Sequence, residues 1–384
     1  WSSDVCSSDL RQYVDLESNR QAASLADAYN RIGDCLYQNR QFSLAEENYS
    51  RAAQLSPSAG DYSIYQKGFL LGLQKDYKGK ISAMDRLISE YPESQYVDDA
   101  LFEKGRSYVL LENSSSAAQA FEKLIREFPL SSLARKAGIQ LGLLYYNDNQ
   151  PEKALAAYKQ VISNYPGSEE AKIALQDLKS VYIDLNDINA YASYVNSIGG
   201  NIRLEVGEQD SLTYIAAEKL FMRGDNDGAR RSLINYLQTF PEGAFSSNAN
   251  FYLGSIAFAK KEFDEAIQRF KSVIASGDTK FLEESVARTA EIEYLSKDYP
   301  AALESFKRLQ IVAENPENRQ AARLGIMRCA LQTGQQKDAL LAADELLKEP
   351  KLSPELEAEA RYVRAKAYIA QKQANKALAD LKEL

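Results

Sequence analysis

Two short stretches of the sequence contain the glycine, acidic and lysine residues that bind phosphate or calcium in other proteins. In residues 72–80, GLQKDYKGK, a lysine follows a glycine as it does in a phosphate-binding loop. Six residues separate the two glycines instead of the four that such a loop requires, and Ile81 replaces its Ser or Thr. Residues 224–228, GDNDG, begin like a calcium-binding loop, but Tyr236 stands where its twelfth residue should be glutamate. We therefore predict neither a phosphate site nor a metal site.

No histidine occurs in the sequence. This removes the catalytic triads and general bases that depend on histidine, together with the commonest metal ligand. The three cysteines, Cys6, Cys35 and Cys329, are spaced neither as a metal site nor as a disulfide framework. We interpret Cys35 and Cys329 as small buried side chains of helices, and we find no motif for a serine or cysteine nucleophile. The sequence predicts a protein that is not an enzyme and uses no cofactor.

The charges and the hydropathy of the chain exclude two further classes of protein. Its 384 residues include 46 basic and 54 acidic residues, which give a formal net charge of −8. Nucleic-acid binding needs a concentrated basic surface, and no basic run of that kind is present. No stretch approaches the length of about eighteen apolar residues that a membrane-spanning helix needs. We expect no nucleic-acid partner and no transmembrane span within this chain.

Residues 133–166, LARKAGIQLGLLYYNDNQPEKALAAYKQVISNYP, show which elements could position a site. Apolar residues recur at helical spacing on both sides of the polar turn NDNQ, and Pro151 suits the first turn of a second helix. Small residues at Gly142 and Ala154 predict a close crossing of the two helices, because larger side chains would separate the backbones. Tyr158 is predicted to fill the space toward the next hairpin. We expect the stretch to form a helix–turn–helix hairpin.

The same pattern recurs about ten times along the chain. Four prolines end successive copies and lie 35, 37 and 37 residues apart: Pro57, Pro92, Pro129 and Pro166. The fifth copy is degenerate, because Lys179 and Tyr191 stand where Gly142 and Ala154 stand in the template. A period of about 34 residues with this pattern indicates a solenoid of helical hairpins.

This repeat resembles the tetratricopeptide repeat, and the resemblance covers residues 22–384. It implies an all-α fold, a right-handed superhelical solenoid of about ten antiparallel helix hairpins. Three joints between hairpins read aromatic-Pro-x-Ser, at residues 91–94, 128–131 and 165–168. These joints resemble those of two bacterial envelope proteins, the Tol-Pal accessory protein and the lipoprotein of outer-membrane protein assembly.

The array is expected to divide into two parts. Residues 1–10, WSSDVCSSDL, do not join the repeat and resemble a translated sequencing-adapter scar, so we expect them to be non-native. We predict an N-terminal array at 11–198, a joint loop with a short extended piece at 199–210, and a C-terminal array at 211–384. The second array stops inside a hairpin, and we expect it to be truncated. Whether the joint is a hinge or an ordinary inserted loop stays open.

The resemblance implies a binding surface, because the first helices of tetratricopeptide hairpins line a concave groove for partner proteins or peptides. The groove positions lie three before, one after and four after the Gly142-type residue of each hairpin. In this chain they include Tyr65, Phe69, Phe102, Arg106, Ile139, Leu143, Tyr146, Tyr214, Phe221, Phe251 and Phe258. Aromatic and arginine side chains commonly dominate binding energies at interfaces. The alternative is that these side chains pack between hairpins.

The residues and the resemblance together predict a non-catalytic scaffold that binds partner proteins or peptides on its concave face, in a bacterial cell envelope or periplasm. Two alternatives are a glycan-binding envelope protein, whose aromatic side chains would stack on sugars, and a cytoplasmic regulator or assembly factor of the tetratricopeptide class. A lipid anchor upstream of the chain is compatible with the envelope prediction. Binding of chaperone C-termini is disfavoured, because Asp27, Asn30 and Asp34 occupy the groove of the first hairpin and the two aspartates would repel a terminal carboxylate.

Overall fold

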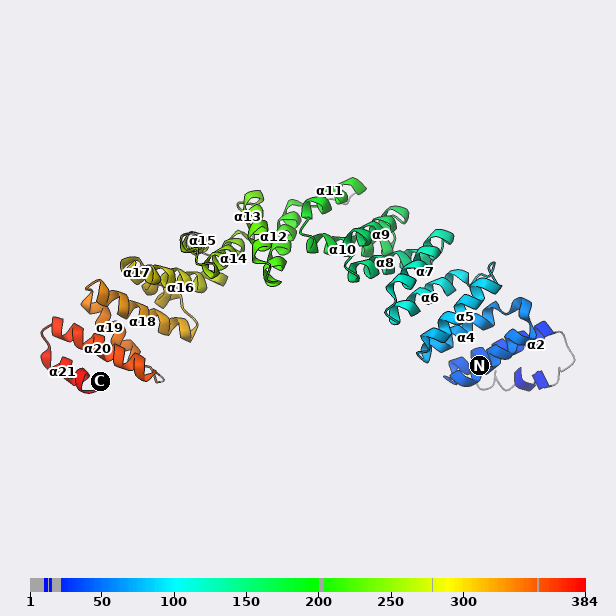
Figure 1. The fold of residues 1–384 in the computed structure, drawn as a ribbon, viewed down its shortest axis with the longest axis horizontal. Coiled ribbons are helices and arrows are strands. Elements are labelled where there is room, and N and C mark those ends of the chain that lie inside the picture. Colours follow the sequence, from blue (N-terminus) through cyan, green and yellow to red (C-terminus); the bar gives the residue numbers. More distant parts are fainter. Residues whose placement is uncertain (1–9, 13, 16–21, 200–203, 278, 351) are drawn as a thin grey trace. The chain divides into compact units, whose positions relative to one another are not determined.

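The computed structural model, shown in Figure 1, describes residues 10–12, 14, 15, 22–199, 204–277, 279–350 and 352–384. These residues form helices and the turns between them, and no strand occurs among them. The chain divides into two compact units, residues 1–182 and 183–384. The all-α class that we predicted is confirmed.

In the first unit, helices alternate as first and second members of hairpins. The first members are α2 (Ala22–Gln38), α4 (Asp61–Leu73), α6 (Val97–Leu110), α8 (Ser132–Asn147) and α10 (Glu169–Asp184). The second members are α3 (Phe42–Leu55), α5 (Tyr77–Glu90), α7 (Ser114–Glu127) and α9 (Pro151–Asn164), and the short 3-10 helix η1 (Pro57–Ala59) precedes α4. The division between the units falls two residues before the end of α10, inside the degenerate fifth repeat.

The second unit continues the same alternation. Its first members are α12 (Val206–Met222), α14 (Ser246–Ala259), α16 (Thr279–Leu295), α18 (Pro316–Gln332) and α20 (Pro354–Ala370). Its second members are α11 (Ile188–Ile198), α13 (Asn226–Thr239), α15 (Phe263–Ser276), α17 (Tyr299–Val312), α19 (Gln336–Leu346) and α21 (Ala374–Lys382). The prediction of a helical-hairpin solenoid is confirmed, and the handedness of its superhelix stays a prediction.

One backbone feature marks the turn inside every hairpin. Seven residues after the Gly142-type position, the residue between the paired helices has a positive φ of 53° to 83°. These residues are Arg40, Lys75, Glu112, Asn149, Asn186, Gly224, Lys261, Lys297, Gly334 and Lys372. A left-handed residue directly after a helix lets the following amides bond to the last carbonyls, which ends the helix. The turn therefore falls at the same position of the repeat in all ten hairpins, including the degenerate fifth.

Gly142 makes room for an aromatic ring rather than for a neighbouring backbone. A Cβ atom added to Gly142 would lie 2.6 Å from Cζ of Tyr158, whose side chain is buried. Equivalent pairs are Gly33 with Tyr49, Gly105 with Phe121, and Gly254 with Phe270. The ring of Tyr158 therefore lies against α8 of its own hairpin, and its hydroxyl bonds to Asp177 of α10 in the next hairpin. That the ring itself fills the space toward the next hairpin stays a prediction.

Hydrogen bonds from the joints tie successive hairpins of the first unit together. Oγ of Ser94 donates to Asp61 at 2.6 Å, and Oγ of Ser131 donates to Asp98 at 2.7 Å. Each bond spans 33 residues, from a joint to the first turn of the preceding first helix. Ser131 also accepts from the amide of Leu133 at 3.1 Å and thereby caps α8. Ser131 thus caps the first helix of one hairpin and bonds this hairpin to the preceding one.

Part of the predicted joint loop is helical. Residues 206–210 belong to α12, so the predicted loop is wrong over these residues. Residues 200–203 lie outside the described part of the chain. Asp210 is buried, and its carboxylate accepts from the Tyr236 hydroxyl at 2.5 Å and from the Ala244 amide at 2.9 Å. These bonds satisfy the buried carboxylate of Asp210. The stretch can therefore form the start of a helix although its sequence lacks helical periodicity. The predicted domain ranges stay a prediction.

The core of each unit lies between its first and second helices. One cluster of the first unit joins the buried side chains of Met84, Leu101, Phe121 and Leu141, among others. In the second unit, one core cluster surrounds Phe306, Ile326 and Met327. Among the helices described, none combines the length and the apolar composition needed to cross a bilayer.

Candidate functional site

In the first unit, the predicted groove aromatics pack against neighbouring side chains. The ring of Tyr65 in α4 stacks on Tyr96, which precedes α6, with centroids 5.2 Å apart and an interplanar angle of 16°. Phe102 in α6 is half-buried, and its ring centroid lies 5.9 Å from that of Phe121. Phe69, Ile139 and Tyr146 are also half-buried, whereas Arg106 and Leu143 are exposed.

In the second unit, one predicted groove residue belongs to the core. Tyr214 in α12 is 2% exposed, its ring stacks on Phe245 at 4.5 Å, and its hydroxyl donates to Glu218 at 2.6 Å. The assignment of Tyr214 to a partner-binding surface is therefore wrong, because a partner cannot reach this side chain. Phe251 stacks on Phe281 at 4.2 Å and is half-buried. Phe221 and Phe258 are half-buried as well.

These stacked pairs share a spacing that was not used in the sequence-based prediction. Their members lie 31, 31 and 30 residues apart: Tyr65 with Tyr96, Tyr214 with Phe245, and Phe251 with Phe281. The second ring comes from the start of the next first helix, so each pair joins two hairpins. Packing between hairpins thus accounts for one face of each ring. Contact with a partner stays a prediction for Tyr65 and Phe251, whose side chains keep some exposure.

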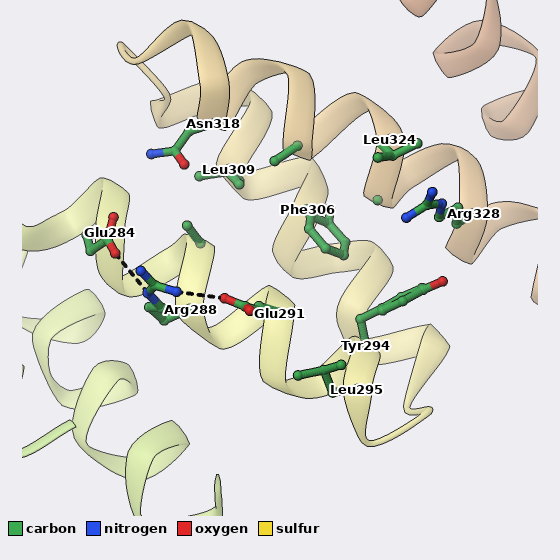
Figure 2. Close-up of a pocket in the computed structure, with 13 residues that line it drawn as sticks. Glu284, Arg288, Glu291, Tyr294, Leu295, Phe306, Leu309, Asn318, Leu324 and Arg328 are labelled. Atoms are coloured by element: carbon green, nitrogen blue, oxygen red, sulfur yellow. Dashed lines mark hydrogen bonds and ion pairs between the residues drawn. The ribbon is translucent and has the colours of Figure 1, made fainter. Parts of the chain in front are cut away.

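A pocket of about 280 Å³ lies between α16, α17 and α18 of the second unit (Figure 2). Two of the helices around it are first members of consecutive hairpins, and α17 lies between them in the chain. Its lining comprises Glu284, Ala287, Arg288, Glu291, Tyr294, Leu295, Phe306, Leu309, Asn318, Ala321, Leu324, Gly325 and Arg328. Apolar side chains form most of this surface and charged side chains stand on both sides of it.

The inner wall of the pocket is apolar and closely packed. Phe306 is 8% exposed, and Leu309 beside it is buried. A Cβ atom on Gly325 would overlap the ring of Phe306. The absence of a side chain at Gly325 therefore lets the ring lie against the backbone of α18, where it forms the base of the pocket. Leu295, at the end of α16, is exposed and extends the apolar surface outward.

Two arginines on the pocket are held in place by carboxylates. Nε of Arg288 donates to Glu284 at 2.8 Å and Nη1 donates to Glu291 at 2.9 Å (Figure 2). Arg328 makes a two-pronged contact with Glu359 of α20, with both distances 2.7 Å. Such paired contacts fix the plane of a guanidinium group. Within the described residues, Nη2 of Arg288 and Nη1 of Arg328 donate no hydrogen bond, so both retain donors for a ligand.

The pocket occupies the groove positions that the repeat register defines. Counting from Ala290 in α16 gives Ala287, Glu291 and Tyr294, and all three line the pocket. Counting from the equivalent position in α18, residue 327, gives Leu324 and Arg328. The sequence-based selection missed these residues because it stopped at the hairpin of α14, so it left out even the aromatic Tyr294. The same spacing, applied to every hairpin without regard to residue type, would have found them.

The chemistry available around the pocket is that of binding. Burial raises the pKa of the Cys329 thiol in α18 to about 11, although the neighbouring Arg328 lowers it, so the thiol stays protonated near neutral pH. A protonated thiol is a poor nucleophile. Within the described part of the chain, no cluster of three or more side chains could hold a metal ion. Glu284 and Glu291 serve as partners of Arg288.

Models of known protein families match four segments of this chain. Tetratricopeptide-repeat models match residues 26–58, 62–94 and 216–279, and a family described as an outer membrane lipoprotein matches residues 98–176. The chain therefore contains tetratricopeptide repeats and a segment similar to that lipoprotein family. Scaffolds of the tetratricopeptide type bind protein or peptide partners and are generally non-catalytic. No curated protein sequence matches the chain.

Solved structures that are similar to this chain include three proteins. A crystal structure of MamA is 20% identical, with 45% of this chain and 89% of that chain covered and a TM-score of 0.37. YrrB, described as a tetratricopeptide-repeat protein with an unusual peptide-binding site, is 16% identical, with 57% and 95% covered and a TM-score of 0.37. BtubC from P. vanneervenii is 14% identical, with 51% and 87% covered and a TM-score of 0.41.

Proposed function

We propose that this chain is a non-catalytic scaffold that binds a protein partner as a peptide segment, and that the pocket between α16 and α18 receives a bulky apolar side chain of that segment. The observation that carries the proposal is the coincidence of the pocket with the groove positions of two consecutive hairpins. An interaction scaffold is the role that tetratricopeptide repeats generally have, and the pocket supplies a specific place for contact.

The lining of the pocket suits a peptide side chain. Its volume of about 280 Å³ lies near the lower end of the about 300–1,000 Å³ that pockets for drug-sized molecules enclose. Phe306, Leu309 and Leu324 would bury an apolar side chain. The remaining donors of Arg288 and Arg328, one on each side, would bond to backbone carbonyl oxygens of the same segment. A peptide supplies both an apolar side chain and backbone carbonyl oxygens.

The other predicted groove residues would extend this contact along each array. Phe221, Phe251 and Phe258 are half-buried in the second unit, and Tyr65, Phe69, Phe102 and Tyr146 are half-buried in the first. Exposed Arg106, whose Nη1 donates to Glu103 at 3.2 Å, would direct its remaining donors to an acidic residue of a partner. We propose these residues as secondary contacts, each in its own unit.

We propose further that the scaffold works in a bacterial cell envelope. The support is the similarity of residues 98–176 to an outer membrane lipoprotein family and the aromatic-Pro-x-Ser joints within or beside that segment. Cell fractionation with an antibody against the chain tests this proposal. Recovery with envelope membranes or the periplasmic fraction is expected, and recovery only with cytosolic proteins would overturn it.

The test of the peptide site is a selection of random displayed peptides on the folded chain. We expect the selected peptides to share a large apolar residue. The substitution Ala321→Trp places an indole in the pocket from an exposed position of α18, and we expect it to weaken their binding about tenfold or more.

The matched control is Ala275→Trp, which adds the same side chain at an exposed position of α15 away from the pocket. It should change binding by less than about twofold, and neither variant should shift the thermal melt appreciably. If no peptide is selected, or if the Ala321→Trp variant binds as tightly as the parent chain, the proposed peptide site is wrong.

A further inference from the structure

A second, larger groove lies in the first unit, between two second helices rather than two first helices. It is lined by α7 and α9, which form its sides, and by Leu141 and Tyr145 of α8. Its volume is about 600 Å³. Because second helices form the face of the array away from the first helices, this groove is separate from the surface that tetratricopeptide groove positions define.

The shape of this groove matches an α-helix. Its lining along α9 runs from Lys153 to Asn164, a span of eleven residues that corresponds to about 16 Å or three helical turns. Leu141 and Ala157 are buried at its base, and Ala156 on its side is exposed. Small side chains between two helices let a third helix approach closely enough to pack its ridge into their groove.

The charges of the groove favour an acidic occupant. Two basic residues, Arg126 and Lys153, and one acidic residue, Glu122, line it. Arg126 is paired with Glu127 at 3.1 Å, so Lys153 is the basic residue left for a partner. The Tyr145 hydroxyl donates to Glu122 at 2.6 Å, and Nζ of Lys153 lies 5.3 Å from the centroid of the Tyr145 ring. Within the described residues Lys153 forms no ion pair. A carboxylate of a partner would supply an ion pair for Lys153.

The corresponding groove one hairpin earlier differs in the lysine that lines it. There, between α5 and α7, Tyr108 stands at the position of Tyr145, and the lysine beside it, Lys104, comes from α6 and is paired with Asp85 at 2.5 Å. That lysine is already neutralised by the chain itself. Lys153 comes from α9 instead, at the position where Ser116 stands one hairpin earlier, so only the tyrosine is common to the two grooves.

An exposed leucine adjoins one end of the groove between α7 and α9. Leu130 is 99% exposed, and it follows Pro129, which lines the groove. At the other joints that contain proline, the equivalent residue is Ser58, Glu93, Gly167 or Glu242. The Tyr165 hydroxyl donates to the carbonyl oxygen of Pro129 at 2.8 Å, so the joint that carries this leucine is fastened to the next one. Scattered surface leucines need no explanation, but this one continues an apolar groove.

From this combination of groove, charge and leucine, we propose that the groove between α7 and α9 binds an amphipathic helix of a protein partner, about three turns long, with an apolar stripe and acidic flanking residues. The apolar stripe would contact Ile125, Ala156 and Leu141, and an acidic residue would reach Lys153. The partner helix would also cover Leu130. This binding surface is independent of the pocket proposed above, which lies in the other unit.

The test uses a displayed library of helix-forming peptides in which one face is randomised, selected on the whole chain. We expect binders with apolar residues at positions i, i+3 or i+4, and i+7, flanked by Asp or Glu. Ala156→Trp should weaken their binding about tenfold because it fills the groove from an exposed position, and Lys153→Glu should weaken it about fivefold. The matched control, Ser163→Trp, changes an exposed residue of the same helix outside the groove.

Three results would overturn the proposal. The first is a selection that yields no helical, acidic binder. The second is binding that Ala156→Trp leaves unchanged, or that Ser163→Trp weakens equally. The third is a concentration-dependent dimer of the chain alone that Ala156→Trp dissociates, because a second copy would then occupy the groove. Ala321→Trp should leave helix binding unchanged, so failure of the peptide site and failure of this groove are distinguishable.

Discussion

The pairing of Gly142 with Tyr158 gives a test of how a single glycine supports a hairpin. Gly142→Ala would place a methyl group 2.6 Å from Cζ of a buried ring, so the ring or the backbone must shift. We expect a loss of about 1–3 kcal/mol, seen as a lower thermal melt and faster hydrogen exchange in α8 and α9. The control is Gly207→Ala in α12, where no atom lies within 4 Å of the added methyl.

That control should have the opposite effect. Alanine in a helix interior is more stable than glycine by about 0.5–1 kcal/mol where space is open. Gly207 is the second residue of α12, where the gain is smaller, so Gly207→Ala should raise the melt slightly. Equal destabilisation by both substitutions would contradict the ring-contact explanation and would point to a general effect on helices.

Asp99 gives a second test at the level of one residue. Burial, followed by the nearby charges of Asp98 and Glu103, raises the pKa of the Asp99 carboxyl above its ordinary value, and a hydrogen bond from the Tyr65 hydroxyl opposes this only in part. The folded state therefore binds a proton more tightly than the unfolded state, so the charged form of Asp99 costs stability as pH rises through its raised pKa.

Asp99→Asn should therefore raise the thermal melt at pH 7, by roughly 1–3 °C. The gain should shrink as the pH falls and vanish below the ordinary pKa of about 3.9, where the parent residue is protonated in both states. Thermal melts of both proteins between pH 3 and pH 7 would measure this. A gain that is constant across that range would contradict the electrostatic cause.

Residue positions could be predicted from the sequence better than side-chain directions. The register identified Gly142, Ala154 and Tyr158 as core positions because their types recur with a fixed spacing, and all three are buried. It could not tell that Tyr214 lies in the core, since the same position is half-buried at Phe251. That difference depends on which side chains the next hairpin presents, and spacing within one repeat does not contain this information.

At the scale of elements, the joints are the features whose role the structure adds. The aromatic-Pro-x-Ser sequence marked the joints, but the partners Asp61 and Asp98 lie 33 residues earlier and have no local signal. The start of α12 is similar. Residues 206–210 lack helical periodicity, and the bonds that stabilise Asp210 come from Tyr236 and Ala244, far along the chain.

A double-mutant cycle on Asp98 and Ser131 measures how strongly one joint ties two hairpins. The hydrogen bond to the carboxylate should give a coupling energy of about 1–2 kcal/mol between Asp98→Ala and Ser131→Ala. Local opening energies from amide hydrogen exchange in α6 and α8 are the appropriate measurement, because single hairpins of a repeat array can open without global unfolding.

The chain contains its own control one hairpin later. Arg135 stands 33 residues before Ser168, where Asp98 stands before Ser131, and it packs over the ring of Tyr165 instead. The corresponding cycle, Arg135→Ala with Ser168→Ala, should give a coupling energy near zero. Equal coupling at both joints would show that the Asp98 bond contributes nothing of its own.

At the scale of the whole molecule, the number of hairpins was predictable and the division of the chain was less so. The repeat period fixes ten hairpins because every copy buries its apolar face against its neighbours. The units part between Tyr182 and Ile183, within the fifth copy, where Lys179 and Tyr191 replace the small residues of the template. The sequence identified this copy as degenerate. The joint was nevertheless predicted further along the chain, because the glycine pair at 199 and 200 interrupts the helical pattern there.

Ionisable groups spread over both units lead to a prediction for the response of the whole molecule to alkaline pH. Burial is the largest cause that raises the pKa of many tyrosines, and it raises the pKa of Tyr145 and Tyr191 to about 12. The others with raised pKa values are Tyr49, Tyr62, Tyr65, Tyr158, Tyr165, Tyr214, Tyr236 and Tyr252. In the fold these phenols stay protonated at a pH where the unfolded chain would release the protons.

The sign of the linkage follows from that difference. Stability from these tyrosines is fully present below the ordinary pKa of about 10 and is lost as pH rises above it, because the unfolded state then binds fewer protons than the folded state. With no histidine in the chain, the thermal melt should change little between about pH 6 and pH 8.5 and then fall steeply above about pH 10. Tyrosine ionisation, followed by ultraviolet absorbance, should coincide with loss of helical circular dichroism. Titration of all 24 tyrosines near the ordinary pKa while the helices persist would contradict the burial of these ten side chains.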